Sequence, residues 1–288
     1  MASSLFLFIE KSAFDALAFE ISITPKPGLV DLRSLGAHND MSAKLLMKSA
    51  RAISPYIANA FDIGRKGAHA DARRVFERLR ENGKAAESEM LASTNGINTH
   101  KGAIFALSIL ACAYGRICKA HPSIEEICKE AGLLSRDTLS EELNDIRNRP
   151  PKTHGERAVC QNILGARGEA LSGYRGITRI ALPAFKEALS MKLNENDAGV
   201  YALLRLISET QDTCLYARGG EEGMEYAMEK ARRALQKKDR LIFEAKRLDR
   251  LFKSRNLSPG GCADLIRAAK FLMNIVNNGQ YRPWEDTI

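Results

Sequence analysis

Polar and charged residues stand at the start of an apolar helix in the segment INTHKGAIFALSIL, residues 97–110. Asn98 or Thr99 can cap this helix, because a short side-chain oxygen accepts hydrogen bonds from the free amides of the first turn. The same helix end carries roughly half a positive charge, which makes Lys101 unfavourable there unless an anion lies nearby. The segment therefore indicates an anion-binding site, and the alternative is that Lys101 points into water.

Four further segments depart from ordinary helical sequence. Residues 24–42, TPKPGLVDLRSLGAHNDMS, are too rich in Pro and Gly for a helix and too apolar for a loop without a functional role. Residues 153–173, THGERAVCQNILGARGEALSG, are helical by context, although each internal glycine costs up to about 1 kcal/mol relative to alanine. Residues 211–223 and 256–265 carry Gly-Gly pairs at helix ends, where free amides can hold phosphate. Close approach by another backbone or by a ligand is a reason for such glycines.

The composition is that of an ordinary globular protein, with 45% hydrophobic and 27% charged residues in a chain of 288. The apolar run at the N-terminus ends at Glu10 and Lys11, too early for a signal peptide. No apolar stretch approaches the ~20 residues of a membrane span. The six cysteines show neither CxxC pairs nor zinc-finger spacing with the histidines. We expect a cytoplasmic protein that does not associate with membranes.

The net charge of +8 is concentrated in one region. Residues 229–255 hold eleven Lys or Arg and four Asp or Glu, and their apolar positions suit one buried helical stripe. The aromatic residues fall on that stripe, so they make a poor stacking platform for bases. We interpret the basic residues as a solvated face and expect no nucleic-acid partner; guidance of a polyanionic substrate is the alternative.

Almost no alternation of the kind typical of strands is present, and amphipathic helical segments recur throughout. We therefore predict an all-α fold with functional loops at helix ends, and one domain over residues 1–288. A weaker interpretation places a boundary near 148–151. Capping boxes support helix starts at Ser123, Thr138 and Thr153, and Ser258-Pro259 resembles a cap before proline at the first helical position. The predicted helices run at about 4–20, 41–61, 68–82, 101–119, 123–132, 138–147, 155–173, 177–191, 197–210, 221–236, 239–254 and 259–277.

Five stretches together resemble the triphosphoribosyl-dephospho-CoA synthase family. They are EISITPKPGLVDLRSLGAHNDM, GINTHKGAIFAL, THGERAVCQNILGARGEA followed by ALPAF, DTCLYARGG and LSPGGCADLI. They stand in the family's order and span residues 20–266, which is nearly the whole chain. No single stretch is specific, whereas five in order are highly specific.

The resemblance implies that the 2′-hydroxyl of dephospho-CoA displaces adenine from C1′ of ATP. The product would be the prosthetic-group precursor of the acyl carrier protein of citrate lyase or malonate decarboxylase, passed on to a holo-transferase for that carrier protein. A triphosphate needs cations and helix starts, and Mg²⁺ is its natural counterion. The sugar carbon passes through a cationic state that a carboxylate can stabilise or assist by base catalysis. The sequence does not show the oligomeric state.

The five stretches supply candidate residues for each of these tasks. Candidates for binding substrate or phosphate are Lys26, Asn98, Lys101, Arg167, Arg218, Gly219, Gly220, Ser258, Gly260 and Gly261. Candidate metal ligands are Asp31, Asp40 and Asp212, and candidate catalytic residues are Glu169, Glu156, His154 and His100. Our hypothesis is that Glu169 or Glu156 activates the acceptor hydroxyl, and that Lys101 and Arg167 bind the triphosphate.

Two positions depart from the family pattern. Cys214 stands where the family usually has Asn, and a thiol cannot replace an amide in a polar contact. Arg175 stands where the family has a proline, after Gly173 and Tyr174, and it can alter which acceptor fits. Both changes concern the exact substrate more than the class of reaction.

Structural roles compete with the functional ones. Glu156 can complete a capping box with Thr153, and Asp264 suits the positive end of the helix that follows Ser258-Pro259. His100 and His154 each neighbour a cap, and Arg167 with Glu169 can form internal salt bridges. The functional alternatives are transfer to a different alcohol, a nucleotide-binding module without catalysis, and a binder of nucleic acid or an acidic partner through residues 229–255.

Overall fold

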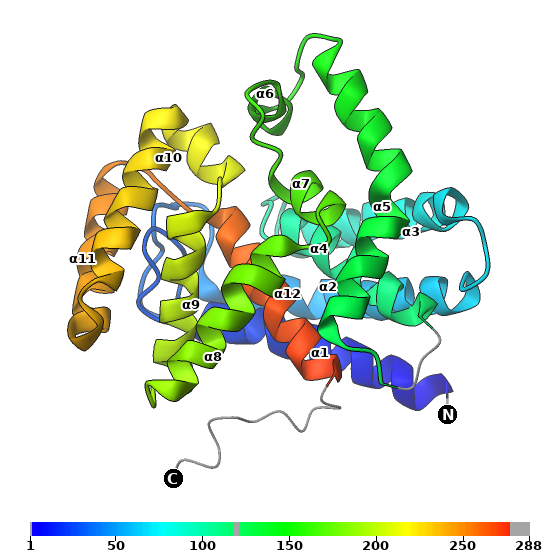
Figure 1. Ribbon diagram of the computed structural model, residues 1–288, viewed down its shortest axis with the longest axis horizontal. Coiled ribbons are helices and arrows are strands. Elements are labelled where there is room, and N and C mark those ends of the chain that lie inside the picture. Colours follow the sequence, from blue (N-terminus) through cyan, green and yellow to red (C-terminus); the bar gives the residue numbers. More distant parts are fainter. Residues whose placement is uncertain (1, 118–120, 277–288) are drawn as a thin grey trace.

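The computed structural model describes residues 2–117 and 121–276, and every regular element within these ranges is helical. The predicted all-α fold is therefore confirmed (Figure 1). The elements are α1 Ala2–Ser22, α2 Ala43–Lys66, α3 Ala72–Ser93, α4 Lys101–Arg116, α5 Ile124–Arg147, α6 His154–Cys160, α7 Gly165–Leu171, the π-helix η1 Gly176–Ala181, α8 Leu182–Ser190, α9 Glu195–Glu209, α10 Thr213–Leu235, the 3₁₀-helix η2 Lys238–Arg240, α11 Leu241–Ser254 and α12 Gly260–Val276.

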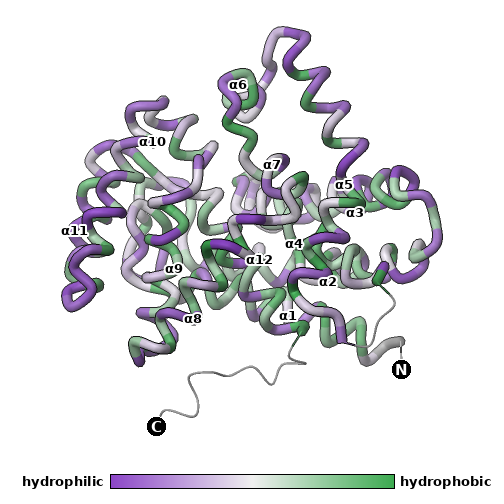
Figure 2. The backbone as a smooth tube through the Cα atoms, viewed as in Figure 1, coloured by the Kyte–Doolittle hydropathy of each residue, from purple (hydrophilic) through white to green (hydrophobic). Residues whose placement is uncertain are grey.

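The helix α12 runs through the middle of the molecule (Figure 1), where it packs against α1, α4, α9 and η1. Nearly all of its side chains from Cys262 to Ile275 are buried, including the cation of Arg267. Burying one large aliphatic side chain contributes about 1.5–3 kcal/mol, so this central helix ties the two halves of the fold together. By contrast, the outer helix α11 is hydrophilic along much of its length (Figure 2), as expected of a solvated basic face.

Several predicted helix boundaries are wrong; for example, the helix expected at 68–82 is α3, which continues to Ser93. The expected break between 132 and 138 is absent, because α5 continues through the buried Gly132 and contains no proline that would end it; the Thr138 hydroxyl is buried and has no partner among the described residues. The expected helix 155–173 is instead interrupted between α6 and α7. Asn162 and Gly165 adopt left-handed backbone there, with φ of 60° and 54°.

Residues 211–223 differ from the expected loop, because α10 already begins at Thr213. The helix is kinked at Gly220, whose φ of 63° and ψ of −165° are not helical. Only glycine adopts such a backbone readily, which explains the glycine at position 220.

One hydrophobic core contains residues from helices on both sides of 148–151, for example Ile127 of α5 and Phe185 of α8. We infer that the chain forms one domain, since a boundary at that loop would cut through this core. Within the described ranges, no helix has both the length and the apolar character needed to span a bilayer.

Candidate active site

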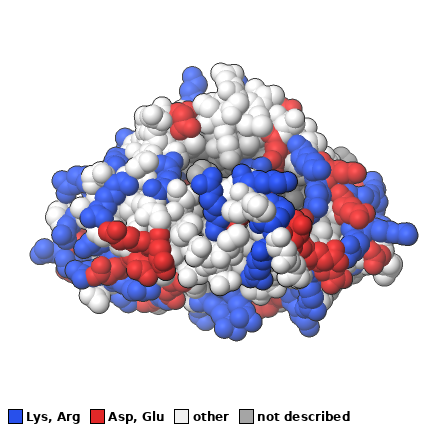
Figure 3. All heavy atoms as spheres, turned by 90° about the horizontal axis from the view of Figure 1, so that it is seen from above, with Lys and Arg blue, Asp and Glu red and all other residues white. Residues whose placement is uncertain are grey.

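A cavity of about 1290 Å³ lies where α4, α6, α7, η1, α10 and α12 meet. Short loops and helix starts form much of its wall, because the chain breaks its helices here with glycines and caps. Lys and Arg side chains gather in the middle of the face seen in Figure 3. Of the predicted site residues, the cavity is lined by Asn98, Lys101, Glu156, Arg167, Glu169, Asp212 and Gly261. Four of the five family-like stretches therefore meet at one cavity.

Glu169 of α7 lines this cavity and accepts a hydrogen bond of 2.9 Å from the N–H of Gly176. Burial raises the pKa of its carboxyl, and the Gly176 amide only partly opposes that rise. The structure places no cation within ion-pair distance of this carboxylate among the described residues. A carboxylate with a raised pKa is a stronger base than an ordinary one, so Glu169 is suited to accept a proton from a substrate.

Asp264 of α12 is a partly buried carboxylate at the same cavity, and the sequence suggested only a role at a helix start for it. Burial raises its pKa to about 6, although the neighbouring Arg267 acts in the opposite direction. The carboxylate packs so closely on Gly102 that a Cβ there would lie 1.9 Å from Oδ2. Gly102 therefore lets the first turn of α4 approach this carboxylate.

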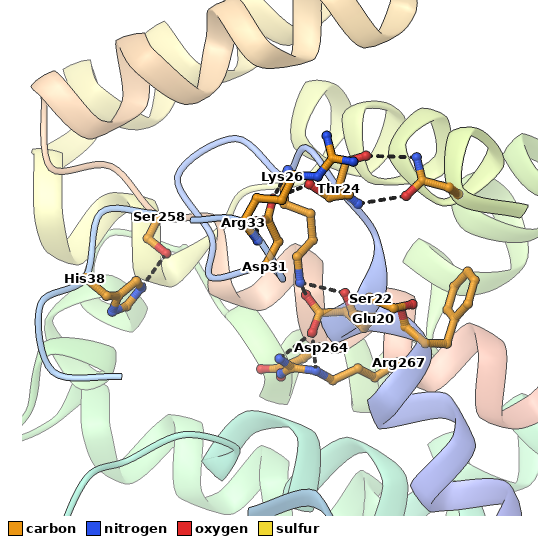
Figure 4. A network of polar contacts seen from close by, with 12 residues as sticks. Glu20, Ser22, Thr24, Lys26, Asp31, Arg33, His38, Ser258, Asp264 and Arg267 are labelled. Atoms are coloured by element: carbon orange, nitrogen blue, oxygen red, sulfur yellow. Dashed lines mark hydrogen bonds and ion pairs between the residues drawn. The ribbon is translucent and has the colours of Figure 1, made fainter. Parts of the chain in front are cut away.

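A buried network of charges holds Asp264 in place (Figure 4). Arg267 donates to Asp264 Oδ1 at 2.7 Å and to Glu20 Oε2 at 2.7 Å, and Lys26 forms an ion pair with Glu20. Burial alone would raise the pKa of Glu20, but the two cations lower it below its ordinary value. Lys26 is 1% exposed and lines no described cavity. We therefore assign Lys26 a structural role in place of the predicted phosphate contact.

Asp212 caps two helices at once. Its Oδ1 accepts from the amides of Cys214 and Leu215 at the start of α10, and its Oδ2 accepts from Cys262 in the first turn of α12 at 2.8 Å. Both oxygens are thus committed to backbone N–H groups, which leaves this buried carboxylate poorly placed to bind a metal. Instead, it fixes the positions of the two helix starts against each other, with Gly261 packed on its carboxyl group.

Glu156 is held by Arg149 in a two-pronged ion pair of 2.8 and 2.9 Å. The hydrogen bonds from Arg149 lower the pKa of Glu156 to about 2, which makes it a weak base. Thr153 caps α6 as predicted, by accepting from the N–H of Glu156 at 3.2 Å. We therefore assign Glu156 the role of fixing the wall formed by α5 and α6, and not that of a base.

Four cations line the cavity: Lys101, Arg167, Arg175 and Arg179. Lys101 pairs with Glu87 of α3 at 2.9 Å, and its side chain is 61% exposed. The puzzle of a lysine at a helix start thus has a local answer, since a carboxylate offsets the charge. The exposed ammonium group still lies at the cavity, within reach of an anionic ligand. Arg179 lies outside the five stretches, so nothing in the sequence singled it out.

The other predicted phosphate ligands lie apart from the cavity, around the loop 24–42. Arg218 donates to the carbonyl of Ala37 at 2.9 Å and to Asn256 Oδ1 at 2.7 Å, while Ser258 and His38 bond at 2.9 Å. Burial and the charge of Arg218 lower the pKa of His38. These contacts anchor the loop. Gly219, Gly220, Ser258 and Gly260 are not among the residues that line the cavity, although they neighbour this cluster or α12.

The two predicted catalytic histidines differ in what the structure shows. His100 is 1% exposed, and its Nδ1 lies 2.8 Å from Ser49 Oγ. Burial lowers the pKa of His100 well below its ordinary value, so the ring is neutral and structural at physiological pH. His154 begins α6, but its side chain lies outside the described part of the structure.

The three predicted metal ligands do not come together. Asp31 accepts from Thr24 Oγ1 and from the amides of Lys26 and Arg33, so it shapes its own loop. Asp40 lies beside His38, 3.7 Å from its Nδ1. Among residues 2–117 and 121–276, no group of three or more His, Cys, Asp or Glu residues could hold a metal. A metal at this cavity would therefore need oxygen atoms from a substrate.

One cavity of this all-helical fold gathers two carboxylates of raised pKa and four cations, an arrangement suited to an enzyme that binds a phosphorylated substrate. A family model described as ATP:dephospho-CoA triphosphoribosyl transferase matches residues 7–283. The chain belongs to this family and is thus a transferase. The resemblance of the five stretches is confirmed.

Similar proteins agree with this assignment. A relative from Salmonella gallinarum carries the name "Probable 2-(5''-triphosphoribosyl)-3'-dephosphocoenzyme-A synthase"; it is 38% identical over 272 residues, which cover 92% of this chain and 90% of the relative. The 2-(5''-triphosphoribosyl)-3'-dephosphocoenzyme-A synthase of Escherichia fergusonii is 36% identical over 264 residues, 89% of this chain and 87% of that protein. The protein of the same name from Pectobacterium atrosepticum is 34% identical over 266 residues, 90% and 86% of the two chains.

Proposed function

We propose that this enzyme joins the triphosphoribosyl group of ATP to the 2′-hydroxyl of dephospho-CoA and releases adenine. The observation that carries this proposal is the pairing of Glu169 and Asp264, two carboxylates of raised pKa, with four cations in one cavity of about 1290 Å³. The cations suit the phosphates of the two substrates, and the carboxylates suit a reaction in which a hydroxyl loses its proton.

Glu169 is the general base in this proposal. It takes the proton of the acceptor hydroxyl as the new bond forms between that oxygen and C1′. The bond from C1′ to N9 of adenine breaks, and its electron pair leaves with the base, which then takes up a proton. Since the sugar carbon becomes cationic on the way, the fixed negative charge of Asp264 stabilises it, oriented by the Arg267 guanidinium.

Mg²⁺ fits the donor set of this cavity only as a partner of the triphosphate. Proteins bind this ion through one or two carboxylates together with substrate phosphates and water. Glu169 and Asp264 are cavity carboxylates whose oxygen atoms are not all occupied by backbone N–H groups. When bound, Mg²⁺ would neutralise charge on the triphosphate. The cations Arg175 and Arg179 supply the protein's own share of that neutralisation.

The product suits a role as prosthetic-group precursor for the acyl carrier protein of citrate lyase or malonate decarboxylase, with a holo-transferase as the next enzyme. The substrates are those of cytoplasmic metabolism, so we place the enzyme in the cytoplasm. Genes neighbouring this one would decide between the two pathways.

Adenine release from ATP, followed by chromatography, tests the proposal. Purified protein with ATP, Mg²⁺ and dephospho-CoA is expected to release adenine, and omission of the acceptor is expected to abolish release. A different alcohol as acceptor would be indicated if adenine forms only with that alcohol; Arg175 and Cys214, the two departures from the family pattern, both line the cavity. ATP binding without adenine release under any condition would contradict catalysis.

A further inference from the structure

A second cavity of about 590 Å³ adjoins the first between α3, α4 and α5. Its volume is that of a site for a small organic group. One part of its wall is apolar, other parts carry charged residues such as Arg80, Glu142 and Arg149, and it contains neither Glu169 nor Asp264. The apolar wall is formed by Phe76, Leu79, Ile104, Phe105, Ile109 and Ile146.

One polar group in this wall lacks a partner. Ser108 of α4 lines the cavity and is 3% exposed, and its hydroxyl makes no hydrogen bond with any described residue. A buried hydroxyl without a partner is costly, so its presence among apolar side chains points to a ligand with a polar atom at this place.

The two cavities share a boundary that carries positive charge. Lys101, Gly102, Glu156, Ala166 and Arg167 line both of them, so two cations and one carboxylate, itself paired with Arg149, lie at the boundary. The Arg167 side chain is 37% exposed, and its Nε forms an ion pair with Oε2 of Glu142 at 3.3 Å. A ligand with an anionic group at this boundary can therefore contact an ammonium and a guanidinium there. The two ends of such a ligand would extend into different cavities.

We infer that the second cavity binds the pantetheine arm of dephospho-CoA, an inference that rests on the proposed function. The reacting 2′-hydroxyl, C1′ of ATP and the leaving adenine must all lie at the carboxylates of the first cavity. In dephospho-CoA, a diphosphate joins the adenosine to the arm, and Lys101 and Arg167 lie where this diphosphate would cross the boundary. The arm is largely aliphatic with two amides, which matches an apolar wall with one free hydroxyl at Ser108.

This arrangement also divides the cations between the substrates. The diphosphate of the acceptor contacts Lys101 and Arg167, and the triphosphate of ATP contacts Arg175 and Arg179, which line the first cavity but not the second. The sequence-based hypothesis assigned the triphosphate to Lys101 and Arg167, and the shared boundary is the reason for the change.

Gly83 of α3 allows the second cavity to be filled selectively. It lines this cavity, and a Cβ built on it meets no atom within 4 Å, so Gly83→Trp places a large side chain there without displacing the core. The matched control is Ala85→Trp, since Ala85 is exposed and lies about 200° around the same helix. Ser108→Ala removes the free hydroxyl alone.

Calorimetric titration with dephospho-CoA, ADP and ATP tests the inference, because ADP keeps the diphosphate but lacks the arm. Wild type and Ala85→Trp are expected to bind dephospho-CoA about tenfold more tightly than ADP. Gly83→Trp is expected to lose this preference, while its affinity for ATP stays unchanged. Ser108→Ala is expected to weaken the binding of dephospho-CoA about threefold or more, with no loss of thermal stability.

An unchanged preference for dephospho-CoA in Gly83→Trp would overturn the inference. So would weakened ATP binding in that variant, which would place part of ATP in the second cavity. Failure of the proposed function would look different, since wild type would then release no adenine from ATP with dephospho-CoA, whatever the binding preference.

Discussion

The guanidinium of Arg267 joins Asp264 at the cavity to Glu20 at the end of α1, with a bond of 2.7 Å to each carboxylate. All three groups belong to one network, so the position of a proposed catalytic carboxylate depends on a distant helix end, since Arg267 and Glu20 are 247 residues apart in sequence. The same network explains why Lys26 is buried.

Activity should depend on the ionisation of Asp264. The pKa of this carboxyl is raised to about 6, so it is largely protonated and neutral at pH 5 and negatively charged at pH 8. We expect kcat/KM for adenine release to fall as the pH drops through about 6. A profile that stays flat from pH 8 to pH 5 would contradict a role for this charge.

Replacement of Asp264 by Asn should lower the rate without lowering stability. A carboxyl whose pKa is raised on folding adds stability at low pH and loses it as the pH rises through about 6, so the ionised form at pH 8 opposes folding. Asp264→Asn removes that charge. Urea titration at pH 8 is expected to give a free energy of unfolding no lower than that of wild type, with activity reduced about 100-fold or more. A large loss of stability would instead mean that Asp264 is structural.

Substitutions at Glu169 and Glu156 should distinguish a role in the reaction from a role in the structure of the cavity wall. Glu169→Gln keeps the shape of the side chain but not the base, so kcat should fall about 10²–10⁴-fold while ATP still binds. Glu156→Gln breaks the paired bonds to Arg149 at the cavity wall and should act mainly on KM. Single-turnover rates and ATP titrations of both variants provide the check, and full activity in Glu169→Gln would remove it as the base.

Lys26→Met should destabilise the protein, because Glu20 would lose one of its two buried cations. Breaking a buried ion pair from one side costs about 3–5 kcal/mol. The double variant Lys26→Met/Glu20→Gln should recover part of that loss, since no uncompensated carboxylate then remains. If Lys26 bound phosphate instead, the single variant would keep its stability and lose ATP affinity.

Much of the local structure could be predicted from the sequence, since it depends on neighbouring residues. Ser123 forms the predicted capping box with Glu126, and Thr153 caps its helix as expected. The cavity also gathers seven of the seventeen candidate residues that the five stretches supplied. Thr138 shows the limit of such reasoning, because its capping pattern lies inside a helix that packing keeps continuous.

The roles of buried charges could not be predicted in this way. Lys26 and Asp212 have the residue types of phosphate and metal ligands, but their partners come from distant parts of the chain: Asp212 reaches the amide of Cys262, and Lys26 shares Glu20 with Arg267. For Asp264 the sequence suggested a structural role, whereas the structure places it at the cavity. Its position at a helix start gave no sign of this placement.

The mass of the acceptor after reaction tests the central claim most directly. Dephospho-CoA incubated with wild-type protein, ATP and Mg²⁺ should gain the mass of one triphosphoribosyl group, with one adenine released per acceptor modified. Under the same conditions, Glu169→Gln should leave the acceptor almost unmodified. An unmodified acceptor with wild-type protein, or equal modification by wild type and Glu169→Gln, would contradict the account.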